Sequence, residues 1–165
     1  MSRVPDTVAG VVARLREIQR GLSPGDGVAV FNAMYLRVTE QVAAELEAGT
    51  TFADPEFMHE LDVRFAGLWI AAYEAADTGR KVPSAWAPLF EERTTGGIFP
   101  IQYALAGMNA HIENDLPLAV VATCRSRGVT PTAHAGRRNR SRADASRRVR
   151  RGSDAAASRR RSAGA

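Results

Sequence analysis

Apolar residues recur at intervals of three and four along most of the first 124 residues, which is the spacing of one face of an α-helix. The pattern predicts helices over about residues 6–20, 28–48, 54–77 and 85–93, and a fifth that begins at residue 100. No stretch alternates convincingly between apolar and polar residues with a period of two, so no strand is expected. We therefore predict an all-α fold, an irregular bundle of about five helices.

Turn and capping residues mark where these helices begin and end. Asp6 is expected to cap the first helix, and Asp54 followed by Pro55 is a typical start for the third. Residues 22–27 contain a proline and two glycines and predict a turn, while Gly49 is expected to end the second helix. About 120 residues with this apolar content are enough for one sizeable core.

The spacing also predicts which residues face that core. In the first helix these are Val8, Val11, Val12, Leu15 and Ile18. In the second they are Phe31, Tyr35, Val38, Val42 and Leu46, and in the fifth Ile101, Leu105, Met108 and Ile112. Pro117 must bend or restart the fifth helix, and residues 118–123 are expected to continue it as a buried segment.

The charge of the chain is divided between two regions. Residues 1–124 carry nine Lys and Arg against 16 Asp and Glu, a net charge of −7. Residues 125–165 carry 13 Arg against Asp144 and Asp154, a net charge of +11, and their only larger apolar residues are Val129 and Val149. We therefore expect a helical domain over residues 1–124 and a disordered basic tail over residues 125–165.

Several classes of protein are disfavoured by composition. The single cysteine, Cys124, rules out an internal disulfide framework and a cysteine-based zinc site. No apolar stretch is long enough to cross a membrane, so no membrane partner is expected. The N-terminus has no apolar segment behind a basic start, which makes the cytoplasm the default location.

The strongest candidate site lies in the fifth predicted helix, where His111 and Asp115 are four residues apart. In a continuous helix this spacing puts both side chains on one face. They would then serve as two ligands of one metal ion, or the carboxylate would orient the imidazole as a base. The alternative is a buried hydrogen bond that only holds the chain around Pro117. Asn109, in the same helix, is a further catalytic candidate.

A second candidate lies in the third predicted helix. Asp62 falls in line with a buried seam that includes Ala66, Trp69 and Tyr73, so its carboxylate should be paired or hydrogen-bonded. His59 lies one turn earlier and is either exposed or a supporting ligand. A divalent metal such as zinc would take His111, Asp115, His59 and Asp62 as its candidate ligands.

The arginines of the tail suggest nucleic acid as a partner, through neutralisation of phosphates. Such binding would be salt-sensitive and unspecific, and no aromatic residue is interleaved for base stacking. Nucleic acid is therefore the less favoured partner, and a small molecule remains the alternative. The chain has no phosphate-binding loop, dinucleotide-binding glycine motif, nucleophile elbow or zinc-protease motif.

Many short stretches at fixed spacing resemble a bacterial family of unknown function, domain-of-unknown-function family 5995. They include residues 25–27, 31–36, 57–62, 83–86, 100–102, 106–111 and 115–117, so that the resemblance covers about residues 22–124. It implies an α-helical domain and supplies no activity. It does select positions for testing, namely Asn32, Glu40, Asp62, Gln102, Asn109, His111 and Asp115.

The resemblance stops near the composition change at residues 125–131, where members of the family usually continue with apolar, ordered sequence. Out-of-frame reading of GC-rich DNA gives the Arg, Ala, Ser and Gly of this tail. We therefore expect residues 125–165 to be frameshifted or mispredicted, with the last elements of the domain missing and an apolar patch left exposed. Translation of the other two frames tests this expectation.

Three functional hypotheses follow. The first is a metal-dependent hydrolase that uses His111 and Asp115, with Asp62 or His59 in support; the His-x3-Asp spacing is similar to part of the zinc site of helical phospholipases C. The second is a non-catalytic binding or structural domain in which the same pair holds helices together. The third is unspecific nucleic-acid binding through the tail.

Overall fold

The computed structural model describes residues 5–131, and their regular secondary structure is entirely helical. The elements are α1 (Val8–Gly21), α2 (Gly27–Ala48), α3 (Pro55–Asp77), α4 (Ala87–Glu91), α5 (Pro100–Asn109), the π-helix η1 (Ala110–Asp115) and α6 (Leu116–Ser126). Because α5, η1 and α6 follow one another without a break, they form one long rod. The predicted all-α bundle of about five helices is confirmed.

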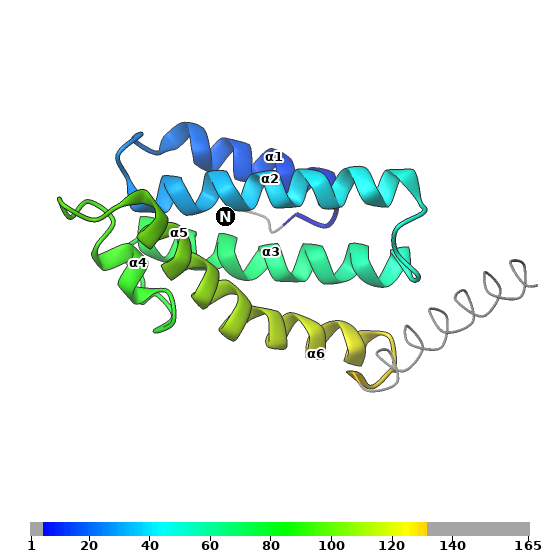
Figure 1. Ribbon diagram of the computed structural model, residues 1–165. Helices are drawn as coiled ribbons and strands as arrows, with labels where there is room; N and C mark the ends of the chain where they lie inside the picture. Colours follow the sequence, from blue (N-terminus) through cyan, green and yellow to red (C-terminus); the bar gives the residue numbers. More distant parts are fainter. Residues whose placement is uncertain (1–4, 132–165) are drawn as a thin grey trace, which may run out of the picture. The chain divides into compact units, whose positions relative to one another are not determined.

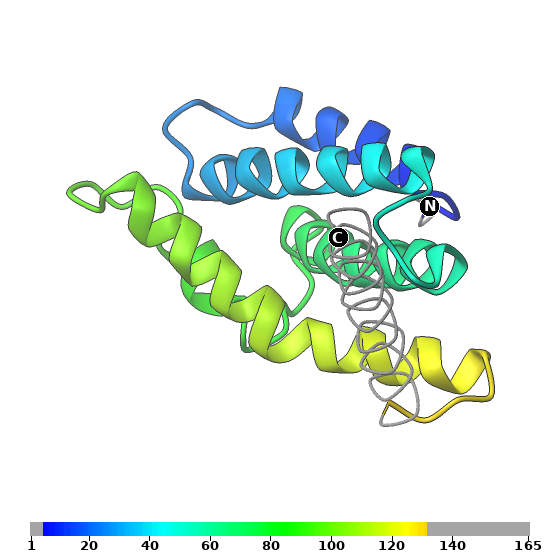
Figure 2. The same cartoon turned by 45° about the vertical axis from the view of Figure 1, so that its right-hand side comes forward.

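The bundle is built from a helical hairpin, a central helix and this rod. Helices α1 and α2 form the hairpin, and α3 lies beside it (Figure 1). The rod crosses α2 through α5 and then runs along α3 through α6 (Figures 1 and 2). Its middle section, η1, therefore lies where α2, α3 and the rod meet.

Most predicted helix ends are where the sequence placed them. Asp54 caps α3 by accepting a hydrogen bond from the Phe57 N–H, and Gly49 ends α2 with a left-handed φ of 68°. The cap of α1 differs from the prediction, because Thr7 and not Asp6 accepts the Gly10 N–H. Helix α4 is shorter than expected, because only residues 87–91 are helical.

Aromatic side chains fill the centre of the bundle. Trp69 and Trp86 are fully buried, and the ring of Phe31 packs edge-on against both, with centroid distances of 4.8 and 5.2 Å. All five predicted core residues of α1 are buried as well. The core thus joins α1, α2 and α3 to the segment around Trp86.

Two glycines let α2 and α5 approach closely. A Cβ at Gly27 would lie 2.3 Å from the Tyr103 ring, and a Cβ at Gly107 would lie 2.2 Å from the Phe31 ring. Each helix therefore offers a glycine on which an aromatic ring of the other helix rests. This reciprocal packing fixes the rotation of α5 and turns the following His111 toward the core.

The predicted apolar face of the fifth helix is wrong. Ile101, Leu105 and Ile112 are exposed and Met108 is half-buried, whereas Tyr103, Ala104 and Gly107 face the core. Small residues and a glycine were favoured at the contact because they permit close packing. The larger apolar residues do share one face of the helix, but it is the face that points away from the core.

Two further core predictions also need correction. Val38 of α2 is exposed, and the position facing the core is Thr39, whose hydroxyl donates to the Tyr35 carbonyl. The segment 118–123 is only partly buried: Leu118 and Val121 are exposed, while Thr123 is buried. Thr39 is tolerated in the core because its hydroxyl bonds the backbone of its own helix.

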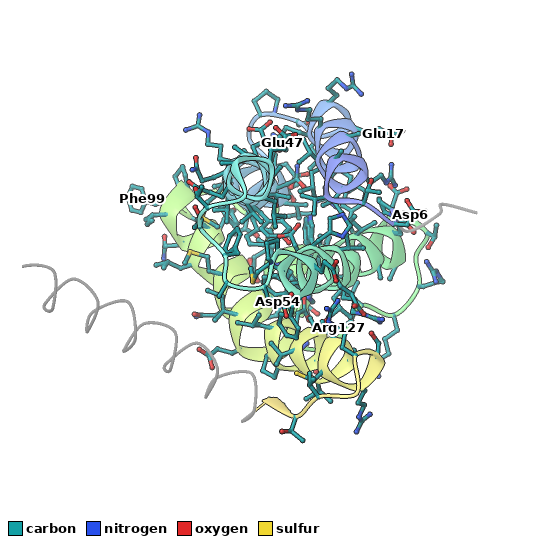
Figure 3. The ribbon with its side chains drawn as sticks, turned by 90° about the vertical axis from the view of Figure 1, so that its right-hand side faces the viewer. Asp6, Glu17, Glu47, Asp54, Phe99 and Arg127 are labelled. Carbon is teal, nitrogen blue, oxygen red and sulfur yellow. The ribbon has the colours of Figure 1, made fainter. Side chains whose placement is uncertain are left out.

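The helical unit ends at Arg127. Arg127 lies close to carboxylates at the start of α3, 3.3 Å from Glu56 and 3.8 Å from Asp54. Figure 3 labels Arg127 and Asp54, which lie near each other. No helix within residues 5–131 is long and apolar enough to cross a membrane. Most of the predicted basic tail lies outside the described residues, so both its disorder and the domain boundary at residue 124 stay predictions.

Candidate functional site

The helical rod changes geometry at the residues predicted to carry the site. Residues 110–115 form a π-helical turn between two α-helices. Pro117 lacks an N–H and cannot bond the carbonyl four residues earlier, which loosens the regular ladder at this point. π-Turns inside α-helices occur frequently at functional sites. The predicted bend before Pro117 thus takes the form of a wider turn that presents His111 and Asp115.

His111 and Asp115 form a buried pair. His111 Nδ1 lies 2.9 Å from Asp115 Oδ2, and their side chains are 3% and 4% exposed. A carboxylate only accepts hydrogen bonds, so the imidazole proton is on Nδ1. That leaves Nε2 with a free lone pair, and no group in the described part of the chain bonds to this buried atom.

Asp115 accepts two further hydrogen bonds. The Trp86 indole N–H donates to Oδ2 over 3.0 Å, and the Asn114 amide donates to Oδ1 over 2.7 Å. The carboxylate therefore has donors on both oxygens and links the rod to the segment before α4. This arrangement holds Asp115 in place and, through it, the ring of His111.

Aromatic rings surround the imidazole. Phe65 stacks on His111 with centroids 3.6 Å apart and an interplanar angle of 6°, while Tyr35 meets it edge-on at 4.5 Å. Burial lowers the pKa of His111 below its usual 6.5, and the hydrogen bond and charge of Asp115 offset part of that change. The imidazole is therefore neutral at pH 7 and can act as a proton acceptor.

Two further acidic groups are connected to this ring, because Tyr35 meets it edge-on and the charge of Asp62 acts on the Tyr35 phenol. Burial raises the pKa of the Tyr35 phenol well above 10, the charges of Asp62 and Asp115 raise it further, and a contact with the Thr39 hydroxyl lowers it. Burial raises the pKa of Asp62 to about 6. Neither the Tyr35 hydroxyl nor Asp62 Oδ2 makes a hydrogen bond of normal geometry. The predicted pairing of Asp62 is thus absent at this oxygen.

We define the buried polar cluster as Tyr35, Asp62, His111 and Asp115. It combines a neutral base, a protonated phenol and a carboxylic acid that titrates near pH 6. Buried polar atoms without partners are uncommon in folded proteins and call for a water, a ligand or a chemical role. Chemically, such a set can hold a small polar molecule and move a proton to or from it.

The four predicted metal ligands do not come together as a metal site. Residues 5–131 contain no group of three or more His, Cys, Asp or Glu side chains that could hold a metal ion. His59 is half-buried on α3, three residues before Asp62. The arrangement therefore leaves His111 and Asp115 as a hydrogen-bonded pair without the third protein ligand that zinc sites use.

Asn109 lies on the other side of the rod from the buried cluster's aromatic rings. It lines an open groove of about 480 Å³ with Ala85, Pro88, Ala106, Ala110, Glu113 and Asn114. Asn114 connects this groove to Asp115 through its amide. The sequence-based candidates therefore divide between a buried cluster and a surface groove.

The remaining family positions have local structural roles. Asn32 is fully buried and hydrogen-bonds to Trp69, Gln19 and the Leu15 carbonyl. Glu40 pairs with Arg16 at the surface. The Gln102 side chain accepts the Phe99 N–H at the start of α5, which caps that helix.

Sequence reasoning missed the contributions of Tyr35, Phe65 and Trp86. Tyr35 and Trp86 are typical core residues in the sequence. Only the structure shows that the Trp86 N–H bonds Asp115 and that the Tyr35 ring lies edge-on against His111. Thr123, whose buried hydroxyl has no hydrogen-bond partner in the described region, was also missed. For Tyr35 and Thr123 the sequence held one signal, namely a hydroxyl-bearing residue at an apolar position of a helix.

The fold and this site are those of an all-helical domain with a buried His–Asp pair on a π-turn. Comparison with known families shows that the chain belongs to a family of unknown function (DUF5995), which matches residues 8–143. The match begins earlier and ends later than the resemblance over residues 22–124. Comparisons with curated proteins and with solved structures found no match.

Proposed function

We propose that the buried polar cluster is an acid–base site for a small polar ligand, with His111 as the proton acceptor. The observation that carries the proposal is the state of the imidazole. Asp115 holds Nδ1, while the buried Nε2 has no partner among the described residues. This is how a carboxylate orients a catalytic histidine in enzymes that use it as a general base.

The neighbouring acids support a reaction and not only binding. The Tyr35 phenol stays protonated at neutral pH and can donate a hydrogen bond to an oxygen of the ligand. His111 Nε2 can accept a proton from a hydroxyl group or a water molecule. Hydrolysis of an ester or amide by activated water is the reaction class that fits both roles, and it is the hydrolase hypothesis in a form that needs no metal.

The metal-dependent form of the hydrolase has less support. It requires at least one more protein ligand beside His111 and Asp115, and the described residues offer no such group.

The test is hydrolysis of a small activated ester, p-nitrophenyl acetate. We expect His111→Gln to lower the rate of the purified protein at least tenfold, in line with the loss of a general base. His59→Gln is the matched control, since it removes the half-buried histidine of α3. An unchanged rate in folded His111→Gln, with the helical circular dichroism preserved, contradicts the proposal.

The second candidate is a structural role for the pair. The observation in its favour is that Asp115 accepts hydrogen bonds from three side chains and so links η1 to Trp86. It predicts that His111→Ala mainly lowers thermal stability and that no variant of the cluster changes ester hydrolysis. Tyr35→Phe separates the two candidates, because only an acid–base site needs that hydroxyl.

A further inference from the structure

The outer side of the rod carries an exposed apolar strip. We define the outer apolar face as Ile101, Leu105 and Ile112, with the half-buried Met108 between them and the exposed Phe99 directly before the helix. Phe99 is 71% exposed and points away from the bundle (Figure 3), and Ile101 is 63% exposed. Contiguous apolar surface of this kind marks an interaction site in soluble proteins.

The charge distribution identifies this strip as an interface. Between Thr94 and Cys124 the only charged residues are Glu113 and Asp115, and Asp115 is buried. Glu113 is therefore the only exposed charged side chain between Thr94 and Cys124. The rest of the domain has a far higher density of charged residues. Depletion of charge is the compositional mark of the centre of a protein interface.

The composition of residues 132–165 does not complement this face. Residues 132–165 contain a single larger apolar residue, Val149, and are dominated by arginine. They offer no set of side chains that would complement a row of isoleucine, leucine and phenylalanine. A second copy of this chain offers an apolar surface that matches this face.

We propose that two copies of this chain associate through their outer apolar faces, with the α5–α6 rods antiparallel. The residues Ile101, Leu105, Met108 and Ile112 are spaced by four, three and four, which reads the same in both directions. A two-fold axis between Leu105 and Met108 therefore places Ile101 of each copy opposite Ile112 of the other. Self-complementary patches of this kind are what two-fold dimers require.

The single exposed charge fits this register. With Ile112 opposite Ile101, Glu113 of one copy lies next to the N-terminus of α5 in the other, where Pro100 is the first helical residue. Helix N-termini carry a partial positive charge and favour a carboxylate. In a parallel arrangement the two Glu113 side chains would instead face each other.

The size of the face predicts a reversible dimer. In this register only residues 100–113 of the two copies overlap, over about 20 Å at about 1.5 Å per residue. A contact of this length is smaller than the interfaces of permanent dimers. We expect dissociation in the micromolar range, so that concentration decides the state observed.

Sedimentation velocity of the full chain from about 1 to 200 μM is the test. We expect a monomer–dimer equilibrium in the wild type and a monomer at all concentrations for Leu105→Glu. Val38→Glu is the matched control, because Val38 is 54% exposed but lies on α2, outside the outer apolar face. A wild-type monomer throughout, or equal disruption by both variants, overturns the proposal.

Cross-linking tests the register without a charged substitution. Ile101→Cys and Ile112→Cys proteins carrying different tags are mixed and oxidised, with the native Cys124 buried and out of competition. We expect disulfides between position 101 of one copy and position 112 of the other. Efficient 101–101 cross-links, or none at either pair, overturn the antiparallel arrangement.

Discussion

Two buried tryptophans of this domain each donate a hydrogen bond to a polar side chain on another segment, and their surroundings differ. Trp69 donates to Asn32 Oδ1 over 3.1 Å, and both N–H groups of the Asn32 amide bond in turn to α1, to Gln19 and the Leu15 carbonyl. Trp86 donates to Asp115, whose partner His111 keeps an unpaired Nε2.

The first network is complete and the second is not. Every polar atom of Asn32 has a partner, so its role in joining α1, α2 and α3 explains why it is there. The buried polar cluster leaves atoms of His111, Tyr35 and Asp62 without hydrogen bonds, each at a cost in folding free energy. Unpaired buried polar atoms are typical of sites that bind or react with another molecule. We therefore place the function at the buried polar cluster beside Trp86.

The largest expected effect comes from breaking the complete network. Asn32→Leu removes the acceptor of the buried Trp69 N–H and the amide that donates to Gln19 and to the Leu15 carbonyl. We expect the free energy of unfolding to fall by about 3–5 kcal/mol. Denaturant titration measures this fall, and Asn109→Ala, at an exposed position, should change stability by less than about 0.5 kcal/mol. A similar small change in Asn32→Leu would contradict a structural role.

The next largest effect is a gain in the free energy of unfolding, expected for Asp62→Asn. The pKa of Asp62 is about 6 in the folded protein and 3.8 in the reference state, so the folded form holds its proton more tightly. The free energy of unfolding should therefore decrease as the pH rises from about 4 to about 6 and stay low above that. Asp62→Asn should remove this decrease and raise stability at pH 7 by of order 3 kcal/mol.

Unfolding curves at pH 4 and pH 7 measure the Asp62 effect. The variant and the wild type should be close in stability at pH 4 and well separated at pH 7. Glu47→Gln, on the exposed end of α2, is the control for removing a carboxylate at the surface. Equal stability of wild type and Asp62→Asn at pH 7 would show that the carboxylate has a partner in solution.

Removal of a single hydroxyl should have a smaller effect. Tyr35→Phe and Thr123→Val delete buried hydroxyls that make no hydrogen bond of normal geometry. We expect thermal stability to stay the same or to increase by up to about 1 kcal/mol, because no bond is lost and a desolvated group is removed. If the cluster is an acid–base site, Tyr35→Phe should nevertheless lower ester hydrolysis. A clear loss of stability in Tyr35→Phe would instead assign the hydroxyl to the structural network.

The smallest effect concerns the acid side of the His111 titration. Its folded pKa lies below 6.5, so the unfolded chain binds the proton more readily and stability falls as the pH drops below 6.5. His111→Gln should lose less stability than the wild type between pH 6.5 and pH 5. The difference between the two unfolding free energies, measured at each pH, isolates this contribution from that of Asp62. Parallel curves would mean that His111 titrates normally.

Much of the fold could be read from local signals. The cap Asp54, the stop Gly49 and the helical starts at Pro55 and Pro100 act through the few residues around them, so their effects were visible in the sequence. The helical spacing of His111 and Asp115 was visible for the same reason. Local rules failed at the start of α1, where Asp6 and Thr7 compete as caps and the structure uses Thr7.

The sequence by itself therefore determined the helices, their ends and the His–Asp pair, because these depend on backbone bonding and side-chain spacing within a few residues. Only the tertiary structure decided which face of α5 is inside, since close contact with α2 favours Gly107 over the larger Leu105. It also decided that Tyr35 lies against His111, and that buried oxygens of Tyr35 and Asp62 have no hydrogen-bond partner in the described part of the chain. Burial and pairing are properties of what packs against a side chain, and those neighbours come from helices far apart in the chain.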